Sequence, residues 1–165
     1  MDPATLQALQ AFPDQLERLY RSIPPAQARW TPASWDGIPS ETFNAIGQLC
    51  HIRDIELDGY QVRLRRLITE TNPTLPSLDS YGLAIERHYD AADPEEVLET
   101  FRRARAATVA TVAALTSTQL ARRGSFEGYG QVTVEALIHY LSSHDQQHLS
   151  GLQWLIGKMK SGSLE

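Results

Sequence analysis

The chain has 165 residues, of which 42% are hydrophobic and 21% charged, as expected for one soluble globular domain. The net charge is −5 with scattered basic residues, so we expect no nucleic-acid partner, because phosphate binding usually needs a basic patch. The single cysteine excludes an internal disulfide, and we expect a cytoplasmic protein without a membrane partner, because neither a signal peptide nor an apolar run of about 20 residues is visible.

The first helix is predicted to begin with Asp2 as its N-cap and Pro3 at its first helical position. Pro13 interrupts the pattern and predicts a break or kink, followed by a second helical run over about 13–22. The next segment, 29–39, is rich in turn-forming residues, and we expect Trp30 and Trp35 within it to plug one end of the core.

A long helix is predicted over about 40–71, because apolar residues recur there on one stripe. Cys50 lies on the stripe and is interpreted as a small core residue, with His51 at the margin. The arginines of this helix are interpreted as its solvated face; they are Arg53, Arg63 and Arg66. The proline-rich segment 72–81 is long for a simple turn and predicts a crossover.

Two further helices follow the crossover. Asp93 and Pro94 predict the start of a helix that continues to about residue 115, and Thr133 predicts the N-cap of a final helix over 133–156. The stretch between them, 123–131, is interpreted as a glycine-rich loop, and no strand pattern is evident. Four amphipathic helices with a long crossover predict an all-α four-helix bundle of one domain, 1–160, with 161–165 as a flexible tail or expression scar.

Two histidines of the final helix, His144 and His148, occupy positions where its apolar stripe calls for apolar side chains. They are four residues apart and therefore project from one face of the helix. His51 points inward from the long second helix and could meet them. Three imidazoles suit zinc, nickel or ferrous iron and leave a coordination position open, as in a catalytic site. Hydrogen-bonded core histidines are the alternative.

Two carboxylates lie one helical turn from these histidines. Asp54 follows His51 by three residues, and Asp145 precedes His148 by three. Each could orient an imidazole by accepting its distal N–H, bind the metal, or move a proton. The HDQQH string is a poor match to the HExxH signature of zinc proteases, because aspartate replaces the glutamate and no histidine follows. A di-iron carboxylate site is not expected either, because only one carboxylate-x-x-His repeat is present. His88 and His139 are given no role.

Three strings of the sequence resemble the DinB-like family. LCHIRDIELDGYQVRLRRLITETNPTLPSLDSY is similar to its second helix and crossover, TVEALIHYLSSHDQQHLSGLQWL to its final helix, and ARWTPASWDGIPSETFNAIGQL to its tryptophan-containing lead-in. The resemblance implies a metal-binding four-helix bundle with non-consecutive helix pairing, commonly a homodimer. It also implies His51, His144 and His148 as ligands of one divalent metal: nickel, zinc or iron.

Characterised members of that family are thiol-dependent transferases and isomerases. The resemblance therefore implies a metal-dependent enzyme acting on a small molecule, most plausibly by thiol S-transfer or isomerisation with a low-molecular-weight thiol as cosubstrate. A metal-activated hydrolase is a close alternative. A non-catalytic metal- or ligand-binding stress protein is the rival from another class. An open position at the metal favours an enzyme, and a fourth protein ligand that closes the site favours the rival.

Overall fold

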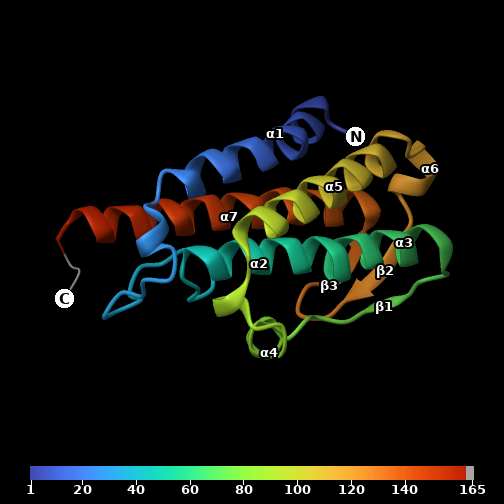
Figure 1. Ribbon diagram of the computed structural model, residues 1–165. Helices are drawn as coiled ribbons and strands as arrows, with labels where there is room; N and C mark the ends of the chain where they lie inside the picture. The colour runs from blue at the N-terminus through green and yellow to red at the C-terminus, as the bar shows by residue number, and fades with distance from the viewer. Residues whose placement is uncertain (163–165) are drawn as a thin grey trace.

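The computed structural model describes residues 1–162, and four long helical segments form its frame (Figure 1). They are α1 (Pro3–Arg21), the continuous run of α2 (Ala45–Asp54), η2 (Ile55–Tyr60) and α3 (Gln61–Thr69), α5 (Pro94–Ala113), and α7 (Val134–Lys160). α1 packs against α5 and α7, and α2 packs against the same two helices. The fold is therefore the predicted all-α four-helix bundle, with α1 and α2 as non-neighbouring helices despite their order in the chain.

The helix starts follow local capping chemistry. The side chains of Asp2, Asp93 and Thr133 each accept a hydrogen bond from a backbone N–H of the first turn, as predicted. The second long helix begins later than predicted, at Ala45, because Asn44 Oδ1 accepts from Gly47 N at 2.9 Å and caps it there. Residues 40–44 consequently belong to the preceding loop, which also contains the 3₁₀ turn η1 (Pro25–Gln27) near its start.

The predicted break at Pro13 was wrong, because α1 runs without interruption through that residue. A proline inside a helix has no N–H for the carbonyl four residues earlier. In this chain the carbonyl concerned is that of Leu9, and it accepts a hydrogen bond from Arg105 Nη1 of α5 at 3.4 Å. A side chain from another helix thus replaces the missing backbone donor, a contact that the local sequence could not indicate.

The second helix changes its geometry directly after Asp54. Residues 55–60 form a π-helical turn, η2, before α3 resumes the α-helical pattern. A π turn inserts an extra residue into the helix and is common at functional sites. Glu56 and Tyr60 of this turn are buried, although an uninterrupted heptad pattern would not have placed them in the core.

A small sheet covers one end of the bundle beside α3 (Figure 1), so the expectation of no strands was wrong. β1 (Thr74–Leu75) of the crossover pairs in parallel with β2 (Arg123–Phe126), which pairs antiparallel with β3 (Gly130–Thr133). Gly128 and Gly130 have positive φ and close this hairpin in the segment interpreted as a loop. The remaining short elements are α4 (Ser80–Glu86), η3 (Tyr89–Ala91) and α6 (Ser117–Leu120).

Two apolar clusters fill the bundle. On α7, one contains Leu137 and Leu141, and the other contains Leu152 and Leu155. Between these positions the buried side chains are polar, and the facing helices contribute polar side chains at the same level. This polar layer consists of Gln48, His51, Asp54, Glu56, Arg105, Thr108, Asp145 and His148. A core of this size needs no polar layer for stability alone, because burying polar groups is costly unless each finds a partner.

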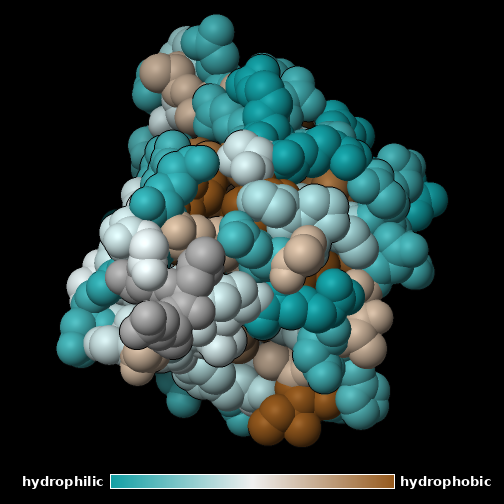
Figure 2. All heavy atoms as spheres, turned by 60° about the vertical axis from the view of Figure 1, so that its left-hand side comes forward, coloured by the Kyte–Doolittle hydropathy of each residue, from teal (hydrophilic) through white to brown (hydrophobic). Residues whose placement is uncertain are grey.

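The surface is mainly hydrophilic, and Figure 2 shows apolar atoms in small separate spots on the face that it presents. Trp30 and Trp35 are partly buried against the cluster that contains Leu152 and Leu155, and the Trp35 ring stacks on Trp154 with ring centroids 6.1 Å apart, which fits their predicted role at the end of the core. Within residues 1–162, no helix is long and apolar enough to cross a membrane. The tail predicted for 161–165 lies outside the described residues from 163 onward.

Candidate metal centre

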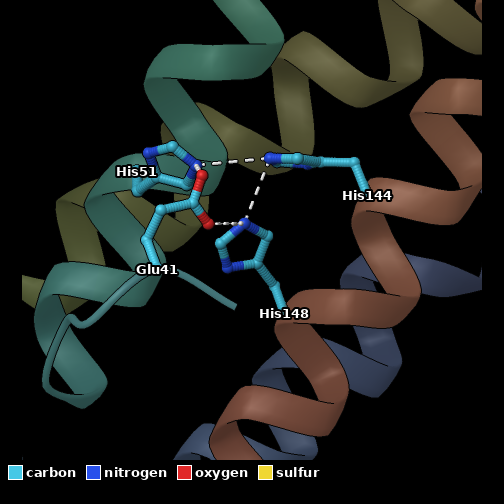
Figure 3. A group of neighbouring side chains, drawn as sticks. All are labelled: Glu41, His51, His144 and His148. Atoms are coloured by element: carbon cyan, nitrogen blue, oxygen red, sulfur yellow. Dashed lines mark hydrogen bonds and ion pairs between the residues drawn. The ribbon is translucent and has the colours of Figure 1, made fainter. Parts of the chain in front are cut away.

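Three imidazoles and one carboxylate converge in the polar layer (Figure 3). The Nε2 atom of His144 lies 3.2 Å from Nε2 of His51 and 3.1 Å from Nε2 of His148. The Glu41 carboxylate faces the same point, with Oε1 3.5 Å from His51 Nε2 and Oε2 3.3 Å from His148 Nε2. Four potential ligand atoms therefore lie within 4.8 Å of one another.

The site is built from three parts of the chain. α7 supplies His144 and His148 from successive turns of one face, α2 supplies His51 from the helix opposite, and the loop before α2 supplies Glu41. His51 and His148 are buried, whereas His144 is half-buried and the Glu41 side chain is 32% exposed. The cluster therefore remains in contact with solvent beside Glu41 and His144.

Gln48 determines which nitrogen of His148 carries its proton. The Gln48 amide nitrogen, which carries two N–H donors, lies within hydrogen-bond distance of three acceptor oxygens: Ser40 Oγ at 2.9 Å and the carbonyls of Glu41 at 3.0 Å and Phe43 at 3.2 Å. These contacts fix the orientation of the amide, so its oxygen faces His148 Nδ1 and accepts a hydrogen bond from it. With the proton on Nδ1, neutral His148 presents an unprotonated Nε2 to the cluster, as a metal ligand requires.

The three histidines are neutral in these surroundings. Burial, followed by the charges of His51, Arg105 and Arg63, lowers the pKa of His144 to about 3. Burial also lowers the pKa of His148 well below its ordinary value, and it lowers that of His51 against the opposing charges of Glu41 and Asp54. The three neutral rings cannot satisfy one another's hydrogen-bonding capacity. The Nε2 atom of His144 faces two other Nε2 atoms, but it carries either one N–H or one lone pair.

A divalent cation fits this arrangement. In a tetrahedral zinc site the ligand atoms lie about 2.0–2.1 Å from the metal and therefore roughly 3.4 Å from one another. The N···N and N···O separations of 3.1–3.5 Å in the cluster have that size. Three imidazoles and a carboxylate are also a donor set that zinc, nickel and ferrous iron accept.

The model of the DinB superfamily matches residues 8–151. The chain belongs to the DinB superfamily. Its fold also matches the solved structure of YfiT from Bacillus subtilis, described as a probable metal-dependent hydrolase with an unusual four-helix bundle topology. The two chains share 19% identity with a TM-score of 0.83, and the match covers 97% of this chain and 90% of YfiT. At that identity the likeness establishes the fold. No curated protein matches the chain.

In this DinB-superfamily protein the structure brings together all three histidines that the sequence singled out. His88 and His139 are exposed and lie elsewhere, as expected, and Cys50 is buried in the core. Burial raises the pKa of the Cys50 thiol to about 11, which makes it a poor metal ligand at neutral pH.

The two aspartates have partners other than the histidines. Tyr89 Oη donates to Asp54 Oδ2 at 2.6 Å, and the guanidinium groups of Arg53 and Arg87 lie 2.7 and 3.0 Å from Oδ1. Both oxygens of Asp145 accept from Arg105, at 2.6 and 2.9 Å. Within residues 1–162, neither carboxylate hydrogen-bonds to a histidine, because arginines compete for the short aspartate side chains more strongly than a neutral ring does.

Glu41 and Gln48 are site residues that the sequence analysis missed. Glu41 was assigned to a helix, where it would have had no reason to face His51, but the Asn44 cap leaves it on a loop that folds over the cluster. Gln48 precedes His51 by three residues, so the sequence could predict that both lie on one face of the helix. It could not predict the contact between Gln48 and His148, because the two residues are 100 positions apart.

Proposed function

We propose that this protein is a metal-dependent enzyme that acts on a small molecule, with His51, His144 and His148 holding one divalent transition metal. The convergence of three neutral imidazole nitrogens is the observation that supports it most directly. The Gln48 contact adds to it, because a histidine that served only as a core residue would not need its tautomer fixed in favour of a bare Nε2.

Among metal-dependent reactions we favour hydrolysis. A bound divalent cation would polarise a substrate carbonyl and activate water as a nucleophile. Glu41 would then accept the proton of that water. Its carboxylate lies beside the Nε2 atoms of His51 and His148, and it comes from a loop where it is partly exposed to solvent. The description of YfiT as a probable metal-dependent hydrolase agrees with this choice.

Thiol S-transfer, the reaction implied by the resemblance, has less support from the contacts. Arginines are the natural partners of a thiol cofactor's carboxylates, but the three that the sequence singled out on α2 and α3 are engaged within the chain. Arg63 is buried, contrary to the solvated face predicted, and donates to the Pro76 carbonyl at 2.9 and 3.2 Å. Arg53 pairs with Asp54, and Arg66 pairs with Glu70 at 2.9 Å. Use of a low-molecular-weight thiol therefore stays a prediction.

Elemental analysis tests the metal site. Protein purified without an immobilised-metal column should contain close to one equivalent of nickel, zinc or iron. The His144→Ala and His148→Ala variants should lose it, and His139→Ala, an exposed histidine of the same helix, should keep it. A parent protein that stays metal-free after incubation with each ion, or equal metal content in all four proteins, would overturn the proposal.

The Glu41→Gln variant separates an enzyme from a non-catalytic metal protein. If Glu41 accepts the proton, the variant should keep its metal and lose hydrolysis of small amides and esters by about 10²–10³-fold, within the range of general-base catalysis. If Glu41 is instead a fourth ligand that closes the site, the variant should bind metal more weakly and the parent should hydrolyse nothing. Activity assays with and without added thiols decide between hydrolysis and S-transfer.

The homodimer and the cytoplasmic location stay predictions. Tyr140 and Trp154 of α7, two aromatic residues that could have formed a dimer interface, make contacts within the chain: the Tyr140 ring centroid lies 4.8 Å from that of Tyr129, and Trp154 stacks on Trp35. The large exposed apolar side chains among residues 1–162 are Tyr81, Ile85 and Tyr129. Sedimentation velocity of the purified protein would measure the oligomeric state.

A further inference from the structure

Tyr60 is a buried tyrosine that lies directly beside the histidine cluster. It is the last residue of the π-helical turn η2, and only 5% of its surface is exposed. Its ring centroid lies 5.9 Å from that of His144, with the two planes inclined by 57°. Because η2 adds an extra residue to the helix after Asp54, the turn decides that this side chain faces α7.

The hydroxyl of Tyr60 has no hydrogen-bond partner within residues 1–162. Other tyrosines near the site do have one: Tyr89 donates to Asp54, and the Tyr81 hydroxyl contacts Thr42 Oγ1 at 3.0 Å. A buried tyrosine hydroxyl normally finds such a partner. The fully enclosed unpaired side-chain atoms of the described residues are Glu56 Oε1 and Arg105 Nε, so the small exposed part of Tyr60 includes its hydroxyl.

The surroundings hold the Tyr60 ring in place. The Arg63 guanidinium lies 5.7 Å from the centroid of the Tyr60 ring and 4.5 Å from that of Phe126 on β2. Arg63 is itself fixed by its two hydrogen bonds to the Pro76 carbonyl. A ring held in place before any ligand arrives carries its hydroxyl in a fixed position, and a donor fixed in advance stabilises developing charge at little reorganisation cost.

We propose that the Tyr60 hydroxyl is a catalytic residue that donates a hydrogen bond to the carbonyl oxygen of an amide or ester substrate. This inference rests on the proposed function. When water adds to the carbonyl carbon, one of its protons passes to Glu41 and the carbonyl π electrons move to the oxygen. Tyr60 hydrogen-bonds to that oxygen and keeps its own proton. The carbon–heteroatom bond then breaks, and the leaving group takes the proton from Glu41.

Ligand binding tests this contact without relying on turnover. Acetohydroxamate is a small carbonyl compound that chelates divalent metals, and its binding to the zinc-loaded protein can be measured by calorimetry. The Tyr60→Phe variant should bind it at least tenfold more weakly than the parent, a change of about 1.4 kcal/mol. Tyr20→Phe is the matched control, because Tyr20 is also buried, at 8% exposure, and belongs to α1. Equal affinity in parent and Tyr60→Phe, or no binding by the parent, would overturn the inference.

Kinetics separate failure of this inference from failure of the proposed function. With a hydrolysed amide or ester, Tyr60→Phe should lower kcat by about 10²-fold and change KM little, as expected for loss of one oxyanion donor. Unchanged kcat in Tyr60→Phe together with lost kcat in Glu41→Gln would refute the role of Tyr60 alone. A parent protein without metal or turnover would refute the proposed function, and the role of Tyr60 with it.

Discussion

Replacing Arg105 by methionine should strongly destabilise the bundle. Its guanidinium is 2% exposed and lies between two buried carboxylates, donating to Asp145 at 2.6 and 2.9 Å and to Glu56 at 2.9 Å. Methionine has a similar length and would fill most of the space between the Phe12 and Phe101 rings that flank the guanidinium. The substitution therefore removes the charge and leaves both carboxylates buried without a cation.

The magnitude follows from the unpaired charges. Removing one member of a buried ion pair typically costs about 3–5 kcal/mol, because the remaining charge stays desolvated. The Leu9 carbonyl, left free by Pro13, also loses its Arg105 donor, so we expect the upper part of that range. For a domain of this size each kcal/mol lowers Tm by about 2–4 °C, which predicts a fall of about 10 °C or more.

Urea denaturation at pH 7 measures the effect. Arg103→Met is the matched control, because Arg103 lies on the same helix with 71% of its side chain exposed and should change stability by less than about 0.5 kcal/mol. Adding Asp145→Asn and Glu56→Gln to Arg105→Met should restore part of the loss, because neutral amides are cheaper to bury than unpaired carboxylates. A loss below about 1 kcal/mol in Arg105→Met would refute the reasoning from buried charge.

Two further predictions concern the histidine cluster. Gln48→Leu should weaken metal binding about 10–100-fold, measured by competition with a chelating dye, because His148 loses the acceptor that fixes its tautomer; unchanged affinity would show that the contact does not tune the ligand. For the metal-free protein, His144 has a pKa of about 3 when folded and about 6.5 when unfolded. The unfolded state therefore binds more protons between these values, so the free energy of unfolding should decrease as pH falls from 6.5 toward 3. The slope against pH, from urea melts, should be smaller in His144→Gln; an equal slope would contradict the assignment.

The sequence by itself determined the long helices and the three histidines. Caps at Asp2, Asp93 and Thr133 and the apolar stripes are local features, since helix geometry alone decides which residues share a face. The same geometry placed His144 and His148 together on α7. It could not reveal that Pro13 leaves α1 unbroken, because the compensating donor comes from another helix.

Only the tertiary structure decided the remainder of the site. Glu41 faces the cluster because the Asn44 cap and the Gln48 amide hold its loop over α2, and these contacts depend on how the loop folds back. The π turn at 55–60 brings Tyr60 beside His144. Asp54 and Asp145 share faces with histidines in sequence, yet Arg105 of α5 takes both oxygens of Asp145, and Arg53, Arg87 and Tyr89 take those of Asp54. Side-chain pairing across the core is set by packing of distant segments, whereas sequence spacing reports only neighbours on one helix.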